Sequence, residues 1–246
     1  MAHRHKYGWN RDKQDHRDRR ANFSGDPAPS ADLRPKCPPI YDQGHLGSCS
    51  ANAVCGAFRF ECLRQGRDYE PSRLFLYYTE RQKEGTVAQD SGASLRAGIK
   101  CTVKTGVCTE AAWPYDITKF TETPPASCYT AVEKTTQYER VPQELAQLKL
   151  CLQTGFPFVF GFQVHQSFES PDVAKTGIMP MPGANDPVLG GHAVMCVGYD
   201  DARQVFIIRN SWGTGWGDQG HFYMPYTFMT SPECSDMWKL ELVNQK

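Results

Sequence analysis

The 246-residue sequence predicts an α+β fold in which most helices come first and most strands follow. Up to about residue 104, apolar residues recur at helical spacing in three segments, each followed by a glycine that can end a helix. From about residue 117 onward, short runs rich in β-branched and aromatic residues indicate strands. With 40% hydrophobic residues, the chain can bury the core of one globular unit or of two small lobes that share a cleft.

The first half holds the three predicted helices. The first begins at Cys49, carries apolar residues four positions apart and ends at Gly66. The second spans residues 71–84 and the third spans about residues 94–104. Residues 113–116, with the sequence Trp-Pro-Tyr-Asp, are interpreted as the crossing into the second half.

The second half is predicted as strands with one amphipathic helix among them. That helix spans residues 142–154 and is stopped by Gly155. Strands are predicted at residues 135–141, 157–164, 192–199, 205–210, 221–226 and about 237–243.

The charge and hydropathy patterns exclude several functions. The formal net charge is zero, so the chain as a whole is not built to bind nucleic acid or an anionic membrane. No apolar run approaches the ~18 residues of a membrane-spanning helix. The first thirty residues lack the apolar region of a secretory signal, so we expect a cytoplasmic protein, with export by a signal-less route left open.

The sequence contains ten cysteines. None forms a Cys-x-x-Cys pair, so we expect no structural zinc site, and we expect no cofactor. If Cys49 is a nucleophile, nine cysteines remain and at least one is unpaired within the chain. Cys196 lies in a predicted buried strand and is interpreted as a free core thiol.

Residues 1–31 form a basic N-terminal extension. Residues 1–20 hold seven Lys or Arg against three Asp, so that stretch carries a charge of +4 and the remainder −4. A solvated, partly disordered tail is one interpretation. Tyr7, Trp9 and Phe23 favour docking on a surface instead. A weaker third hypothesis is that the basic residues bind the phosphate of a nucleotide or nucleic acid.

The stretch from Gln43 to Ala53 is the first motif with chemical meaning. Ser48 is a candidate N-cap, which places Cys49 in the first turn of a helix, where the helix dipole favours a thiolate. Two nearby glycines let a substrate backbone approach, and the amide of Gln43 could donate to an oxyanion. Taken alone, however, such a cysteine is more often a buried structural residue.

Two later segments favour a catalytic role for Cys49 over a structural one. His192 stands at the start of a predicted buried strand, and Asn210 ends the next strand before a loop rich in glycine and tryptophan. A cysteine, a histidine and an asparagine in this order supply a nucleophile, a base and a group that orients the base. His192 follows Cys49 by 143 positions and Asn210 follows it by 161.

These three segments together resemble the papain-like cysteine peptidases, from about Asp32 to near the C-terminus. The resemblance implies a helical left lobe, about residues 32–116, and an antiparallel, β-barrel-like right lobe, about residues 117–246, with the active-site cleft between them. It implies a thiol endopeptidase in which a Cys49 thiolate and His192 form the catalytic pair. Asn210 would orient His192 and Gln43 would complete the oxyanion hole.

The resemblance also implies where a substrate binds. It places Gly92 beside the substrate backbone and puts small residues around a roomy pocket for the second residue on the acyl side of the cut. Large apolar or aromatic side chains should be preferred there. The implied substrate-binding residues are Gly92, Ser94, Gly161, Gly191, Ala193 and Trp212.

The chain departs from its relatives in ways that mark it as divergent. Relatives usually carry a disulfide-bonded cysteine where this chain has Leu46, which favours a reducing compartment. The extension of residues 1–31 would lie over the cleft as a short covering arm that restrains activity; a floppy tail is the rival interpretation. The expected partners are therefore a peptide or protein substrate and the chain's own N-terminal segment.

Two other function classes remain open at this point. One is a binding or regulatory homologue with a residual cleft, which the complete set of catalytic residues disfavours. The other is a Cys-His acyltransferase of the transglutaminase type. That type prefers an acidic third member, whereas this chain has Asn210 followed by Ser211 and Trp212.

Overall fold

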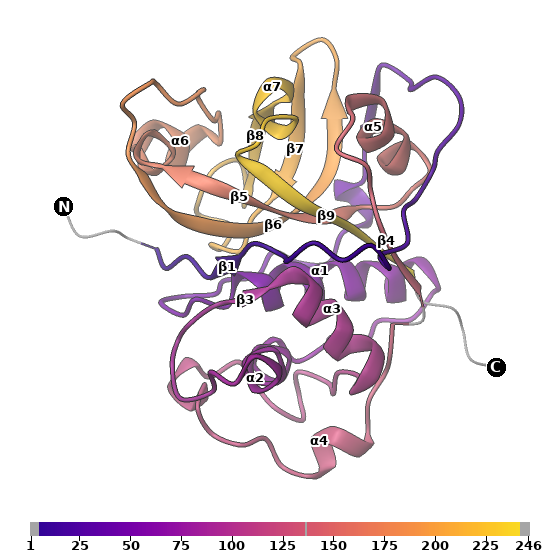
Figure 1. Ribbon diagram of the computed structural model, residues 1–246, viewed down its shortest axis with the longest axis vertical. Coiled ribbons are helices and arrows are strands. Elements are labelled where there is room, and N and C mark those ends of the chain that lie inside the picture. Colours follow the sequence, from indigo (N-terminus) through magenta and orange to yellow (C-terminus); the bar gives the residue numbers. More distant parts are fainter. Residues whose placement is uncertain (1–4, 136, 242–246) are drawn as a thin grey trace.

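The computed structural model describes residues 5–135 and 137–241, which form a sheet lobe and a helical lobe with the first long helix between them (Figure 1). That helix, α1 (Cys49–Arg64), is buried along nearly its whole length because it packs against the sheet on one side and against α2 and α3 on the other. Its N-terminus therefore lies where the two lobes meet.

Each of the four predicted helices is present, and within the described residues three short helices come in addition, one of them starting at the last residue of the strand predicted for 221–226. Besides α1, the helices are α2 (Arg73–Glu84), α3 (Leu95–Lys104), α4 (Ser127–Thr130), α5 (Leu145–Gln153), α6 (Pro171–Thr176) and α7 (Tyr226–Met229), with single 3₁₀ turns at η1 (Arg34–Lys36), η2 (Ile117–Lys119) and η3 (Gln166–Glu169).

Local chemistry sets the ends of two helices in the helical lobe. The Ser72 side chain accepts from the Phe75 N–H to cap α2, and Gly85 ends that helix in a left-handed conformation with φ 75°. The Ser94 side chain accepts from the Ala97 N–H to cap α3 in the same way.

Most strands belong to one antiparallel sheet with the order β4-β9-β5-β6-β7-β8, and β2 pairs with β6 off this path. The predicted α+β class is confirmed, and within the described residues the sheet stays open rather than closing into a barrel. The strands are β1 (Trp9–Asn10), β2 (Ser30–Asp32), β3 (Ala93–Ser94), β4 (Gln137–Arg140), β5 (Phe158–His165), β6 (Val188–Asp200), β7 (Val205–Arg209), β8 (His221–Pro225) and β9 (Cys234–Glu241).

The crossing between the lobes comes later than expected. Figure 1 places α4 with α2 and α3 in the lower lobe, and β4 is the first strand of the large sheet after it. The chain therefore passes into the sheet lobe between α4 and β4 rather than at residues 113–116.

The N-terminal arm, which we define as residues 5–31, runs between the two lobes. In Figure 1 it is the indigo segment that passes below the sheet and above α3. Its strand β1 pairs in parallel with β3, with Trp9 opposite Ala93 and Asn10 opposite Ser94. Its last residues join the sheet lobe, because β2 pairs antiparallel with β6.

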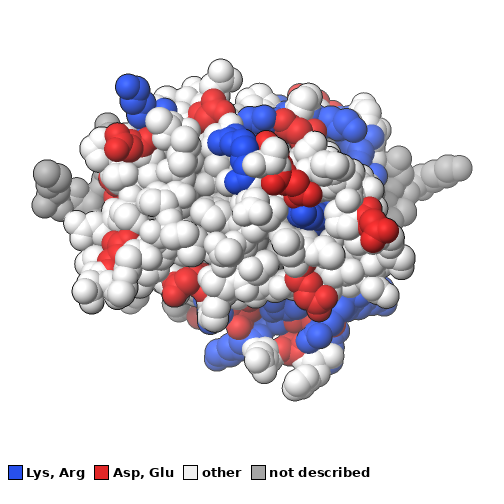
Figure 2. Space-filling view, turned by 90° about the horizontal axis from the view of Figure 1, so that it is seen from above, with Lys and Arg blue, Asp and Glu red and all other residues white. Residues whose placement is uncertain are grey.

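Three further observations bear on the expectations from composition. All ten cysteines are free thiols, and Cys196 is fully buried. Among the described residues, no group of side chains could hold a metal ion, and no helix is both long and apolar enough to span a membrane. From above the sheet lobe, Lys and Arg are interspersed with Asp and Glu, and much of the face carries neither (Figure 2).

Candidate active site

Cys49 is the first residue of α1 and is fully buried beneath the arm. Burial raises the pKa of its thiol to about 11, although backbone N–H groups of Ala193, Gly8 and Ser50 point at the sulfur and oppose that rise. The sequence predicted a favoured thiolate, and with the arm in place the opposite holds. The reason is that exclusion of water outweighs the N–H groups at the helix N-terminus.

Ser48 is the N-cap of α1, as predicted, but its side chain makes no capping hydrogen bond. Its hydroxyl accepts instead from the side-chain amide of Asn52 at 3.0 Å and lies 2.5 Å from the hydroxyl of Tyr115. Ser48 thus ties the start of α1 to the segment that holds Tyr115.

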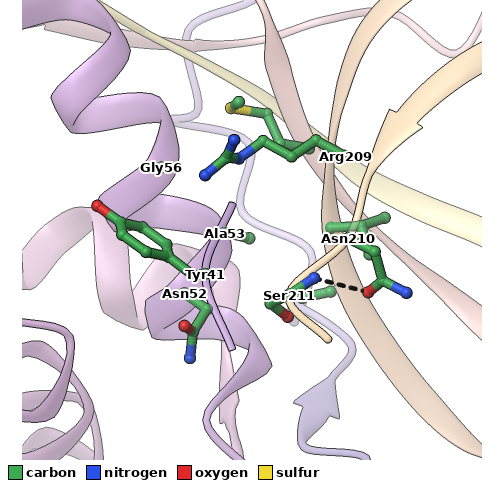
Figure 3. Close-up of a pocket in the computed structure, with 10 residues that line it drawn as sticks. Tyr41, Asn52, Ala53, Gly56, Arg209, Asn210 and Ser211 are labelled. Atoms are coloured by element: carbon green, nitrogen blue, oxygen red, sulfur yellow. Dashed lines mark hydrogen bonds between the residues drawn. The ribbon is translucent and has the colours of Figure 1, made fainter. Parts of the chain in front are cut away.

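The protonation pattern of His192 follows from its hydrogen bonds. Figure 3 shows the backbone N–H of Ser211 donating to Oδ1 of Asn210 at 2.8 Å, which fixes the orientation of that amide. The same Oδ1 lies 2.8 Å from Nε2 of His192, so Nε2 must carry the proton. The other ring nitrogen, Nδ1, is buried without a partner among the described residues and is therefore free to accept a proton.

The surroundings of His192 disfavour its charged form. Burial lowers the imidazole pKa from 6.5 to about 4, and the nearby His5 of the arm adds to this effect. The hydrogen bond to Asn210 and the carboxylate of Glu169 oppose it. The indole of Trp212 stacks on His192 with ring centroids 4.8 Å apart, which shields the bond to Asn210 from water.

A small cavity of about 10 Å³ lies beside Asn210, between α1 and the strands β6 and β7 (Figure 3). The Arg209 guanidinium reaches from β7 toward α1 and donates to the carbonyl oxygens of Pro38 and Pro39. This buried cation therefore ties β7 to the segment that leads into α1, next to the candidate site.

Gln43 is held so that its amide nitrogen faces the cleft. Its Oε1 accepts from the Ser211 hydroxyl at 2.6 Å, which leaves Nε2 to donate to the carbonyl oxygens of Leu46 at 3.0 Å and of Lys6 at 3.2 Å. The proposed oxyanion donor is thus already engaged by a carbonyl of the arm. Ser211, which the sequence reading did not single out, orients Gln43 and also adjoins Asn210.

Three glycines allow the arm to press against both walls of the cleft. A Cβ atom on Gly8 would lie 1.7 Å from the carbonyl oxygen of Gly47. A Cβ atom on Gly92, which has φ +67°, would lie 2.1 Å from the carbonyl oxygen of Gly8. The Gly8 carbonyl accepts from the Ala93 N–H at 2.8 Å, so only glycine fits at position 8 in this arrangement.

The Trp9 side chain lies against Gly161 and Gly191, two of the predicted substrate-binding residues. A Cβ atom on Gly161 would lie 1.9 Å from the indole, and one on Gly191 would lie 2.7 Å from it. Ala193 pairs with Gly161 in the sheet and is fully buried. The hydroxyl of Ser94 caps α3 and donates to Glu84, so the structure gives that side chain no hydrogen bond to the arm.

Beyond the cleft, the arm is anchored by Asp12, whose side chain is completely buried. The carboxylate accepts from Nε1 of Trp238 at 2.8 Å, from Arg140 at 2.9 Å and from the backbone N–H of Arg96 at 3.0 Å. Asp18 pairs with the same two arginines. Asp12 and Asp18 therefore attach the arm to α3, β4 and β9.

Glu169 is a further cleft residue that the sequence reading missed. Its carboxylate lies 3.1 Å from Nδ1 of His5 and accepts from the Tyr7 hydroxyl. His5 in turn stacks on Trp212, with ring centroids 3.8 Å apart and planes within 2° of parallel. Only the position of Glu169, directly after the buried Phe168, could have hinted at its place beside the cleft.

Comparison with known sequences agrees with this geometry. The family model described as papain family cysteine protease matches residues 28–235. An uncharacterized peptidase C1-like protein of Acanthamoeba polyphaga mimivirus is 43% identical over 215 residues, which cover 82% of this chain and 69% of that protein. Cathepsin B-like CP2 of Giardia intestinalis is 32% identical over 205 residues, covering 77% of this chain and 65% of that protein.

Solved structures give the same result. Xylellain, a cysteine protease from Xylella fastidiosa, superposes with a TM-score of 0.92 at 40% identity, covering 98% of this chain and 97% of that one. The proform of the ragweed pollen allergen Amb a 11, a cysteine protease, superposes with a TM-score of 0.71 at 21% identity and covers 91% of this chain and 67% of that one, a likeness of fold alone.

Proposed function

Because the chain belongs to the papain family of cysteine proteases, we propose that it is an endopeptidase in which Cys49 is the nucleophile and His192 the base, and that the arm holds it latent. The observation that carries the catalytic assignment is the bond between His192 Nε2 and Asn210, which leaves Nδ1 without a partner. The N–H of Ala193, the residue after His192, points at the Cys49 sulfur.

The reaction uses these groups in sequence. Nδ1 of His192 takes the thiol proton, and the Cys49 sulfur attacks the scissile carbonyl carbon and forms a C–S bond. The Gln43 amide and the Cys49 backbone N–H stabilise the oxyanion. As the C–N bond breaks, His192 gives its proton to the leaving amine, and it then activates water to hydrolyse the thioester.

The arm occupies each part of this machinery. The Lys6 carbonyl takes the Gln43 donor, the Gly8 N–H points at the Cys49 sulfur, and Trp9 fills the acyl-side pocket. Burial under the arm raises the pKa of Cys49 and lowers that of His192, so the pair stays neutral. Latency thus follows from both steric exclusion and suppression of the ion pair.

The direction of the arm supports its role as an inhibitor rather than a substrate. In a substrate, the acyl-side pocket receives a residue that precedes the scissile carbonyl. In the arm, Trp9 in that pocket follows Lys6, whose carbonyl is at the Gln43 donor. The arm therefore runs opposite to a substrate and does not present the Lys6–Tyr7 peptide bond for attack.

The pocket also indicates the substrate class. Gly161 and Gly191 lack the side chains that would otherwise fill it, and the space accommodates an indole. We therefore propose that peptides with a large aromatic residue at the second acyl-side position are preferred. The arm's Trp9 is in this sense an internal example of what the pocket binds.

The test uses the full chain with Gly8→Ala, because a methyl group at that position collides with Gly47 and should release the arm. This variant should hydrolyse a fluorogenic peptide with Trp at the second acyl-side position faster than wild type, mainly through a lower KM. Adding Cys49→Ala should abolish activity, His192→Ala should cost nearly as much, and Asn210→Ala should cost less.

Gln14→Ala, at an exposed arm residue, is the matched control and should leave the wild-type rate unchanged. Full activity in a folded Gly8→Ala/Cys49→Ala protein would overturn the mechanism. A Gly8→Ala protein that is as slow as wild type while its cleft binds peptide would favour the alternative of a binding homologue.

A further inference from the structure

The proposed mechanism leaves Glu169 without a role. Its carboxylate lies at the end of η3, with 15% of the side chain exposed. Its side-chain hydrogen-bond partners within the described residues are His5 and Tyr7, both from the arm. When the arm leaves, this half-buried carboxylate loses both partners, so it must either take up water or bind a side chain that replaces the arm.

Trp212 forms the floor beside this carboxylate. Its indole packs edge-on against Trp216, with centroids 4.8 Å apart, and against Phe168 at 5.8 Å, so its plane is fixed by neighbours other than the arm. His5 lies flat on this plane while its Nδ1 reaches Glu169. The structure thus displays one occupant: a planar ring that stacks on the indole and can donate N–H to the carboxylate.

The carboxylate of Glu169 and the indole of Trp212 together determine which natural side chains can bind there. An arginine guanidinium is planar, stacks on aromatic faces and pairs with a carboxylate through parallel N–H donors. Lysine can form an ion pair with Glu169 but cannot stack on Trp212, and phenylalanine can stack on Trp212 but cannot pair with Glu169. Aspartate and glutamate would be repelled. Arginine therefore fits this carboxylate and indole best, with histidine next.

The position relative to the cut follows from the arm. The Lys6 carbonyl engages the Gln43 donor, and His5 lies one residue away, on the side opposite to Trp9 and the acyl pocket. Trp212 also stacks on His192, the group that protonates the leaving amine. Glu169 and Trp212 therefore lie on the leaving-group side of the scissile bond.

From these contacts we infer that Glu169 and Trp212 form a subsite that binds an arginine side chain in the first two residues after the cut. This inference rests on the proposed function, because the subsite becomes accessible to a substrate only when the arm has left the cleft.

The experiment measures kcat/KM in the Gly8→Ala full chain with internally quenched peptides that differ only after the cut. Arg, Gln or Glu is placed at the first or the second position on the leaving-group side. We expect Arg to exceed Gln by about ten-fold at one of these positions, as is typical of a charge-assisted hydrogen bond, with Glu lowest. Glu169→Gln should reduce the Arg-to-Gln ratio to about two-fold or less, mainly through a higher KM for the Arg peptide.

Glu233→Gln is the matched control, because Glu233 pairs with His165 and the structure gives it no contact with the arm; it should keep the full ratio. An Arg-to-Gln ratio near one in the Gly8→Ala enzyme would overturn the inference, and so would a ratio that survives Glu169→Gln. An equal loss for every peptide would also overturn it, because Glu169 would then act only through His192. Failure of the proposed function looks different: the Gly8→Ala enzyme would cleave none of the peptides.

Discussion

Trp9 and Gly161 interlock: a single Cβ atom at position 161 would lie 1.9 Å from the indole of Trp9, and the three atoms nearest to it all belong to that ring. Because Gly161 in β5 has no side chain, the same pocket can hold either Trp9 of the arm or a side chain of the proposed substrate. A change at position 161 should act on both.

Gly161→Ala in the full chain should produce opposite effects on two peptides. Because the added methyl displaces Trp9, the arm should dock less well, and a peptide with Leu at the second acyl-side position should be cleaved faster than by wild type. A peptide with Trp there should lose about ten-fold in kcat/KM relative to the Leu peptide, since the pocket has lost about one methyl group of depth. Gly183→Ala, where a Cβ meets nothing within 4 Å, is the control. An unchanged Trp-to-Leu ratio would contradict the assignment of this pocket.

Asp12→Ala should destabilise the fold as well as loosen the arm. The buried carboxylate neutralises Arg140 and satisfies the indole N–H of Trp238, and both lose that partner when it is removed. We expect the free energy of unfolding to fall by about 3 kcal/mol in denaturant titration. Asp26→Ala, at an exposed residue of the same arm, should leave it unchanged. Equal stability of the two variants would mean that Asp12 is not an anchor.

Acid should release the arm. In the docked state the pKa of His192 is about 4 because the ring is buried, and once water enters it should rise toward 6.5. Burial would raise the pKa of Glu169, but the hydrogen bonds from His5 and Tyr7 outweigh it and the net pKa is lowered. For both groups the docked state holds fewer protons than the open state. Docking therefore weakens as the pH falls from about 6.5 toward 4.

The measurement is the alkylation rate of Cys49 in wild type divided by that in Gly8→Ala at each pH, which cancels the thiolate content of the open enzyme. The ratio should rise toward one as the pH falls. His5→Phe keeps the stacking ring but removes a hydrogen bond that lowers the pKa of Glu169 in the docked state, so the ratio should depend less on pH, whereas Gln14→Ala should not change the profile. A ratio that stays flat or falls in acid would exclude this linkage.

The sequence predicted the papain family and most element types because these depend on local pattern. The spacing of apolar residues and the glycine stops located α1, α2 and α3. The proposed roles of Cys49, His192 and Asn210 likewise rest on residue type and order, which the sequence alone displays.

What could not be predicted depends on contacts between distant segments. Docking of the arm requires Gly8 to meet Gly47 and Gly92, and Asp12 to be buried beside residues from far along the chain. The raised pKa of Cys49 comes from its complete burial, which no local pattern reveals. Glu169 was missed for the same reason, since its partners lie more than 160 positions away.

The rate at which iodoacetamide alkylates Cys49 tests the central claim most directly. It is measured by mass spectrometry at pH 7 in wild type, Gly8→Ala and Gly8→Ala/His192→Ala, with the other nine cysteines as internal references. If release of the arm lowers the thiol pKa from about 11 toward the ~8.5 of a free cysteine or below, Gly8→Ala should react about 100-fold faster or more. His192→Ala should remove much of that gain. Equal rates in wild type and Gly8→Ala, or a gain that does not depend on His192, would contradict a latent Cys49–His192 pair held under the arm.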